Sequence, residues 1–88
     1  MASDRTYFTY IMASDSRVLY VGVTKNLEVR VGQHKERMVP RFTERYNVTK
    51  LVWYEPHTSI RAAISRGKQI KGWGRMKKVR LIEERNPT

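Results

Sequence analysis

Four side chains that could handle protons and phosphate occur in order along the first half of the chain. Tyr10 and Tyr20 fall in segments rich in aromatic and β-branched residues, and Arg30 and His34 are four residues apart. In a helix, that spacing puts the guanidinium and the imidazole on one face. A guanidinium binds phosphate oxygens through its fork of donors. The set suits phosphodiester hydrolysis, which needs an activated water, charge neutralisation at phosphorus and help for the leaving oxygen.

Each of these residues has an ordinary structural role when it is considered alone. A strand tyrosine usually packs in the core, and a helical arginine or a lone histidine usually lies at the surface. A tyrosine hydroxyl, with a usual pKa of about 10, is a poor base at neutral pH. Neighbouring cations would lower that pKa, and we expect Arg30 and His34 to supply them. The chemical hypothesis therefore depends on the four side chains converging in space.

The elements that position these side chains can be predicted from local patterns. Turn residues between the first two strands predict a hairpin, and a glycine at position 22 indicates either a close approach by another group or a bulge. Asn26 can cap the first helix, and Thr58 or Ser59 the second. The predicted strands are Tyr7–Ala13, Val18–Thr24 and Leu51–Tyr54, the last ended by Pro56, and the predicted helices cover about 27–37, 60–71 and 75–84.

Strands and helices mix without regular alternation, which predicts an α+β domain with a short antiparallel sheet over residues 1–88. Apolar spacing predicts which side chains face inward. These are Leu27 and Val31 in the first helix, Ile60, Ala63, Ile64, Gly67 and Ile70 in the second, and Met76, Val79 and Ile82 in the third. Trp53 and Trp73 are expected to pack in the core or between helices.

The charge of the chain favours a polyanionic partner. Eighteen Lys and Arg stand against eight Asp and Glu, a formal net charge of +10, and no acidic residue occurs from Pro56 to Ile82. A basic but merely soluble protein, an anionic membrane surface and an acidic partner protein are the competing interpretations. The polar composition and the absence of a clean apolar face argue against a membrane surface, and the apolar runs are too short to span a bilayer. The expected nucleic-acid contacts are Lys25, Arg41, Arg45, Tyr46, Arg61, Lys68, Lys71, Arg75 and Lys78. The chain has no cysteine, which fits a reducing cytoplasm.

The ordered segments Phe8-Thr9-Tyr10, Leu19-Tyr20-Val21-Gly22, Arg30, His34 and Asn86 resemble the motifs of GIY-YIG nucleases. The similarity extends from about Thr6 to Pro87 and is to small stand-alone bacterial members related to the excinuclease C subunit. It implies a central three-stranded antiparallel sheet flanked by about three helices, and a DNA endonuclease that uses Mg²⁺ or Mn²⁺. By that resemblance Tyr20 is the general base, Tyr10 and His34 assist it, Arg30 binds the scissile phosphate and Asn86 supports the site.

The position of the family's metal-binding glutamate is occupied by Gly67. Glycine inside a helix costs about 1 kcal/mol relative to alanine, so it is not there for helix stability. An engineered inactivation, a naturally degenerate nuclease and a close backbone contact are three open explanations. We expect the four side chains to converge beside this empty carboxylate position. The chain should then bind DNA but cut it slowly or not at all, and the alternative is a non-catalytic nucleic-acid-binding module. Branched or single-stranded DNA, RNA and any oligomeric state stay open.

Overall fold

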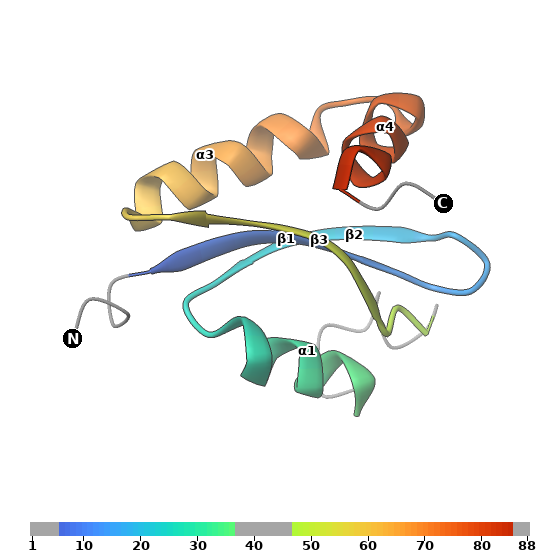
Figure 1. Ribbon diagram of the computed structural model, residues 1–88, viewed down its shortest axis with the longest axis horizontal. Helices are drawn as coiled ribbons and strands as arrows, with labels where there is room; N and C mark the ends of the chain where they lie inside the picture. Colours follow the sequence, from blue (N-terminus) through green and yellow to red (C-terminus); the bar gives the residue numbers. More distant parts are fainter. Residues whose placement is uncertain (1–5, 37–46, 86–88) are drawn as a thin grey trace.

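The computed structural model describes residues 6–36 and 47–85. These residues form an α+β fold, as predicted, with a three-stranded antiparallel sheet of strand order β2-β1-β3. Figure 1 shows α1 on one face of the sheet and α3 and α4 on the other. In chain order the elements are β1 (Tyr7–Ala13), β2 (Leu19–Thr24), α1 (Leu27–Lys35), β3 (Lys50–His57), α3 (Ile60–Lys71) and α4 (Arg75–Arg85).

Strand alternation divides the core into two clusters, one on each face of the sheet. Ile11, Val21 and Trp53 lie with Ile70 on the face covered by α3 and α4. Tyr10, Met12 and Val48 lie on the face covered by α1, where Leu27 and Val31 pack against them. The central strand β1 therefore carries two sets of buried side chains, and Tyr10 belongs to the set beneath α1. The predicted inward positions of Leu27, Val31 and Trp53 are confirmed.

Both predicted helix caps are present. The side chain of Asn26 accepts a hydrogen bond from the Val29 N–H at 3.1 Å, and Ser59 accepts one from the Ala62 N–H at 3.2 Å. Each cap satisfies a backbone donor that the first helical turn leaves without a partner. The Asn26 cap starts α1 two residues after β2 ends, so α1 is held close to the end of that strand.

The predicted end of the third strand is wrong, because β3 continues through Pro56 to His57. Pro56 lies opposite Phe8 in the register with β1. A strand at the edge of a sheet has a neighbour on one side only, so it can hold a residue without an N–H. The position of β3 in the sheet, rather than its sequence, makes the proline acceptable.

Three predicted inward residues are exposed instead. Ile60 and Ile64 are 43% and 42% exposed, whereas Ala63, Gly67 and Ile70 are buried. The narrow buried stripe of α3 follows the i, i+4, i+7 spacing of these three small or apolar residues, and the two isoleucines lie beside it. Met76 in α4 is 71% exposed, and Val79 and Ile82 are half-buried. None of the helices in the described ranges is long and apolar enough to cross a membrane.

Candidate active site

The four side chains singled out from the sequence meet on the α1 face of the sheet. The hydroxyl oxygen of Tyr10 lies 3.0 Å from His34 Nε2 and accepts a hydrogen bond from Arg30 Nε at 3.3 Å. The Tyr20 ring lies 6.3 Å from the Tyr10 ring and 5.3 Å from the imidazole of His34, measured between centroids. The predicted convergence is confirmed, and the catalytic roles of the four residues remain predictions.

Gly22 makes room for this cluster. It is the register partner of Tyr10, and a Cβ atom at residue 22 would lie 2.5 Å from both Cζ and Oη of the Tyr10 side chain. No side chain other than hydrogen fits at that distance, so the glycine allows the tyrosine ring to lie over β2. Of the two explanations for this glycine, close approach is the one that applies.

Burial determines the protonation states of Tyr10 and His34, the inner pair of the cluster. Tyr10 is fully buried, and burial raises the pKa of its hydroxyl even though the hydrogen bond from Arg30 opposes the shift. His34 is 1% exposed, and burial together with the nearby charge of Arg30 lowers the pKa of its imidazole. Both groups are therefore neutral at pH 7. The expectation that cations lower the pKa of the tyrosine is wrong for Tyr10, because desolvation outweighs Arg30 and His34 carries no charge.

Arg30 is the charged member of the cluster. Its hydrogen bond to Tyr10 raises the pKa of the guanidinium, so the positive charge is retained. Its Nη1 donates to Gln33 Oε1 at 3.1 Å, while Nε donates to the tyrosine hydroxyl. These two contacts fix the plane of the guanidinium. Gln33 was missed from the sequence, although its spacing of three residues from Arg30 on a helix could have indicated the contact.

A consistent proton arrangement follows from these contacts. Because the Tyr10 oxygen accepts from Arg30, its own hydrogen can be donated to His34 Nε2. His34 then carries its hydrogen on Nδ1, an atom that is buried and has no hydrogen-bond partner in the described part of the chain. A buried donor of this kind destabilises its site unless something else accepts the bond. In this arrangement the phenol of Tyr10 donates its proton to the imidazole of His34.

Position 67 lies across the sheet from the four side chains. A Cβ atom at Gly67 would contact the Cγ2 methyl groups of Val23 at 3.2 Å and of Thr9 at 3.9 Å. Thr9 belongs to the α3 face, where its hydroxyl donates to the Ala63 carbonyl at 2.8 Å. The structure therefore does not bring position 67 to the Tyr10 cluster. The 3.2 Å contact favours close packing as one reason for the glycine.

The described residues do not fit a divalent metal site. Mg²⁺ and Mn²⁺ need oxygen ligands that include a carboxylate, and residues 6–36 and 47–85 contain no group of three or more His, Asp or Glu that could hold an ion. The acid that precedes α3, Glu55, lies 3.0 Å from Arg66 Nε and 3.1 Å from His57 Nε2. Its carboxylate is already paired with Arg66. The methyl groups of Val23 and Thr9 adjoin position 67, the predicted position of the family's ligand.

The predicted nucleic-acid contacts are placed in part. Lys25, Arg61, Lys68, Lys71 and Arg75 are exposed, and Lys78 is half-buried. Exposure leaves these side chains available to phosphates. Arg41, Arg45, Tyr46 and Asn86 lie outside the described residues.

Trp73 packs against the core of the α3 face, as predicted. It is half-buried against the core cluster of Ile11 and its neighbours. Two cations lie over its ring: Lys77 Nζ is 4.5 Å from the ring centroid, and Arg66 Cζ is 5.4 Å from it. Arg66 also lies 5.9 Å from the ring of Trp53, so it is an internal cation of the α3 face.

Comparison with known proteins agrees with the motifs and the sheet order described above. A family model described as the GIY-YIG catalytic domain matches residues 6–80. The chain belongs to the GIY-YIG family. Members of this family are generally dependent on a divalent metal.

Several small GIY-YIG relatives have similar length. The chain is 32% identical over 80 residues to a UPF0213 protein from Staphylococcus aureus strain Mu3, covering 91% of this chain and 98% of the relative. It is 32% identical over 79 residues to a UPF0213 protein from Staphylococcus haemolyticus, covering 90% and 96%. The solution structure of a UPF0213 protein from Bacillus halodurans matches with a TM-score of 0.57 and 22% identity, covering 89% of this chain and 83% of that one. The predicted similarity to small stand-alone members is confirmed.

Proposed function

We propose that this GIY-YIG protein binds DNA, holds one phosphodiester at the Tyr10–Arg30–His34 cluster, and hydrolyses it weakly or not at all. One observation carries the proposal: a guanidinium that stays charged is fixed by two hydrogen bonds beside a buried tyrosine–histidine pair. A planar cation held in this way is suited to a phosphate oxygen. A DNA partner would place the protein in the cytoplasm.

Each residue of the cluster has a different role in this proposal. Arg30 binds the phosphate and offsets charge that develops on it. Burial raises the pKa of the Tyr10 hydroxyl, which makes it hard to deprotonate, and lowers the pKa of the His34 imidazole, which makes it a weak base, so both residues orient Arg30 and the attacking water. Tyr20 is left as the candidate base, the role that the family resemblance gives it. It lies at the outer side of the pair, within 6.3 Å of the Tyr10 ring centroid.

Weak hydrolysis follows from the absence of a carboxylate at position 67. A metal ion contributes several kcal/mol of charge stabilisation to hydrolysis of this kind. Gly67 provides no ligand, and the methyl groups of Val23 and Thr9 adjoin the position. The alternative proposal is a binding module on the same scaffold that has no hydrolytic function.

A plasmid-nicking assay separates the two proposals. The chain and its Gly67→Glu variant are compared with Mg²⁺ and with Mn²⁺, and Gly67→Ala serves as the matched control because it adds only a Cβ atom. Nicking recovered by Gly67→Glu and absent from Gly67→Ala supports a nuclease that has lost its ligand. No nicking by any variant, with DNA binding intact, leaves two explanations: the chain is a binding module, or a carboxylate at position 67 does not reach the cluster. Equal vigorous nicking by the chain and by Gly67→Glu would refute the proposed impairment.

The basic surface should bind phosphates without strong sequence preference. Lys68, Lys71 and Arg75 are exposed on consecutive helices of a chain with a net charge of +10. If about five phosphates are contacted, the logarithm of the binding constant should fall with the logarithm of salt concentration with a slope near −4 to −5. Replacing Lys71 and Arg75 by alanine should weaken binding to all sequences alike. A slope near zero would remove the electrostatic basis of the proposal.

A further inference from the structure

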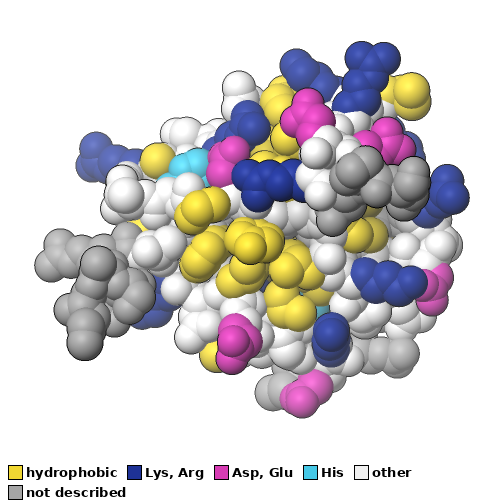
Figure 2. Space-filling model, viewed as in Figure 1, with side chains coloured by type: hydrophobic (Ala, Val, Ile, Leu, Met, Phe, Trp, Pro, Cys, Tyr) yellow, Lys and Arg dark blue, Asp and Glu magenta, His cyan; other side chains and the backbone are white. Residues whose placement is uncertain are grey.

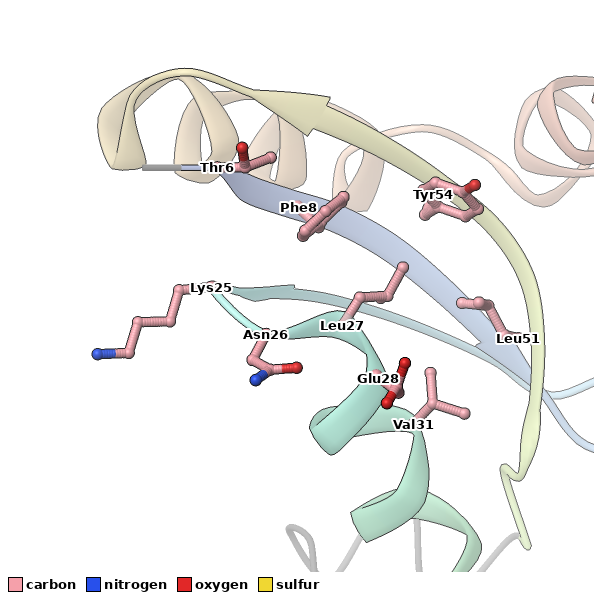
Figure 3. Close-up of a pocket in the computed structure, with 9 residues that line it drawn as sticks. All are labelled: Thr6, Phe8, Lys25, Asn26, Leu27, Glu28, Val31, Leu51 and Tyr54. Carbon is pink, nitrogen blue, oxygen red and sulfur yellow. The ribbon is translucent and has the colours of Figure 1, made fainter. Parts of the chain in front are cut away.

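A groove of about 680 Å³ lies between α1 and β3, on the same face of the sheet as the Tyr10 cluster. Figure 3 shows side chains from β1, β3 and α1 bordering one open space, with Lys25 extending outward near the start of α1. Its volume is in the range of sites that hold small organic groups. The apolar lining consists of Phe8, Leu27, Val31, Leu51 and Tyr54.

Two aromatic rings form one wall of this groove. Phe8 and Tyr54 meet edge to face, with centroids 6.0 Å apart and ring planes at 68°. Tyr54 is 43% exposed, so part of its ring area is available to a ligand. In Figure 2, which has the same view as Figure 1, hydrophobic side chains gather in the middle of the visible side, and both basic and acidic side chains lie around them. An apolar groove with Lys25 at its border suits a ligand that combines a flat ring with a negative charge.

Two charged side chains at the start of α1 determine how a ligand would be oriented in the groove. Lys25 and Glu28 both border the groove and are both exposed, Lys25 just before α1 and Glu28 in its first turn. The ammonium group attracts a phosphate to its own part of the rim, and the carboxylate repels a phosphate from the first turn of α1. A ligand would therefore place its ring inside and its phosphate outside.

The groove is close to the candidate active site along β1. Phe8 and Tyr10 are two residues apart in one strand and point to the same face, a separation of about 6.8 Å along the strand. Leu27 and Val31 border the groove and also pack against the cluster that contains Tyr10. A nucleic-acid strand whose phosphate is bound at Arg30 would thus have its neighbouring nucleotides near the groove.

We infer that the groove between α1 and β3 binds an unpaired nucleobase of a nucleic-acid strand, with the adjoining phosphate beside Lys25. The inference rests on the proposed function, because a nucleic acid must first be the partner. It deepens that function by naming the substrate class: nucleic acid with single-stranded character, since a base inside a duplex is stacked and paired. Aromatic contacts of this kind accept every base, so little sequence preference is expected.

The test uses fluorescence anisotropy with three labelled probes: a short single strand, its duplex, and the same strand with abasic sites in place of the bases. Tyr54→Leu keeps an apolar side chain and removes the ring. It should weaken binding of the intact single strand by roughly 10-fold and leave the abasic strand and the duplex unchanged. Tyr54→Phe, which keeps the ring, should bind like the original chain. Tyr7→Leu, on the other face of β1, is the matched control.

The outcomes separate this inference from the proposed function. Intact and abasic strands that respond equally to Tyr54→Leu, or that do not respond, would overturn the nucleobase site. If Arg30→Lys still weakens binding of all probes in that case, the proposed function survives without the groove. If Arg30→Lys changes nothing, the proposed function fails independently. Methyl NMR signals of Leu27, Val31 and Leu51 that shift with protein concentration alone would assign the groove to a second copy and would also overturn the inference.

Discussion

Replacement of Gly22 by alanine should disrupt the candidate active site and destabilise the whole fold. The added Cβ atom would lie 2.5 Å from Cζ and Oη of Tyr10 and 2.8 Å from Cε1. The tyrosine ring cannot turn aside freely, because it is fully buried and its hydroxyl contacts Arg30 and His34. Gly22 does not have a positive φ, so the collision alone causes the effect.

The size of the effect can be built from two contributions. Forcing extra volume into a packed core costs about 1–3 kcal/mol. Displacing the Tyr10 hydroxyl from His34 leaves buried polar groups without partners, at about 1–3 kcal/mol. Alanine restricts the unfolded chain and offsets roughly 0.4–1 kcal/mol. We therefore expect the free energy of unfolding to fall by roughly 1–5.5 kcal/mol, compared with the ~4–13 kcal/mol typical of a domain of this size.

Urea denaturation and thermal unfolding followed by circular dichroism measure this change. For a domain of this length, each kcal/mol lost lowers Tm by about 4–8 °C. Gly32→Ala is the matched control, because a Cβ atom there meets nothing within 4 Å and the residue lies inside α1. It should raise stability by about 0.5–1 kcal/mol. A Gly22→Ala variant as stable as the original chain would refute the placement of the Tyr10 ring over β2, and the geometry of the cluster with it.

Two further predictions concern single side chains. The lowered pKa of His34 means that the unfolded chain takes up a proton first as the pH falls below 6.5, so unfolding free energy should decrease by up to about 1.4 kcal/mol per pH unit until the folded pKa is reached. Urea denaturation at pH 7 and pH 5 should show this slope and its reduction in His34→Gln; an unchanged slope would contradict it. Arg66→Met removes the contact with Glu55 and the cation–π contact with Trp73, and should cost about 1–2 kcal/mol by thermal unfolding. Arg61→Met, at an exposed position, should have almost no effect, and equal losses in both variants would argue against an internal role for Arg66.

The two faces of the sheet carry different functional features. The α1 face carries the phosphate-directed cluster and the apolar groove. The α3 face carries position 67 and the internal Arg66–Glu55 pair. A carboxylate introduced at residue 67 would start from the face opposite to Tyr10, so the Gly67→Glu experiment also tests whether that side chain can reach the cluster around the edge of β2.

Local patterns in the sequence predicted the order and type of the elements and most of the buried faces within them. Alternation in Tyr7–Ala13 separates Tyr10 from Ile11, and the four-residue spacing of Arg30 and His34 puts both beside the buried tyrosine. The helix caps at Asn26 and Ser59 could also be predicted, because each joins a side chain to a backbone N–H only three residues later. Such features depend on backbone geometry that repeats over a few residues.

The tertiary structure decided what the local patterns could not. It placed Pro56 inside an edge strand, left Ile60 and Ile64 exposed, and raised the pKa of Tyr10. It also joined Phe8 and Tyr54, far apart in the sequence, into one wall of a groove. Burial, desolvation and the contents of a groove depend on which faces of distant elements pack together, and sequence spacing within one element does not specify that packing.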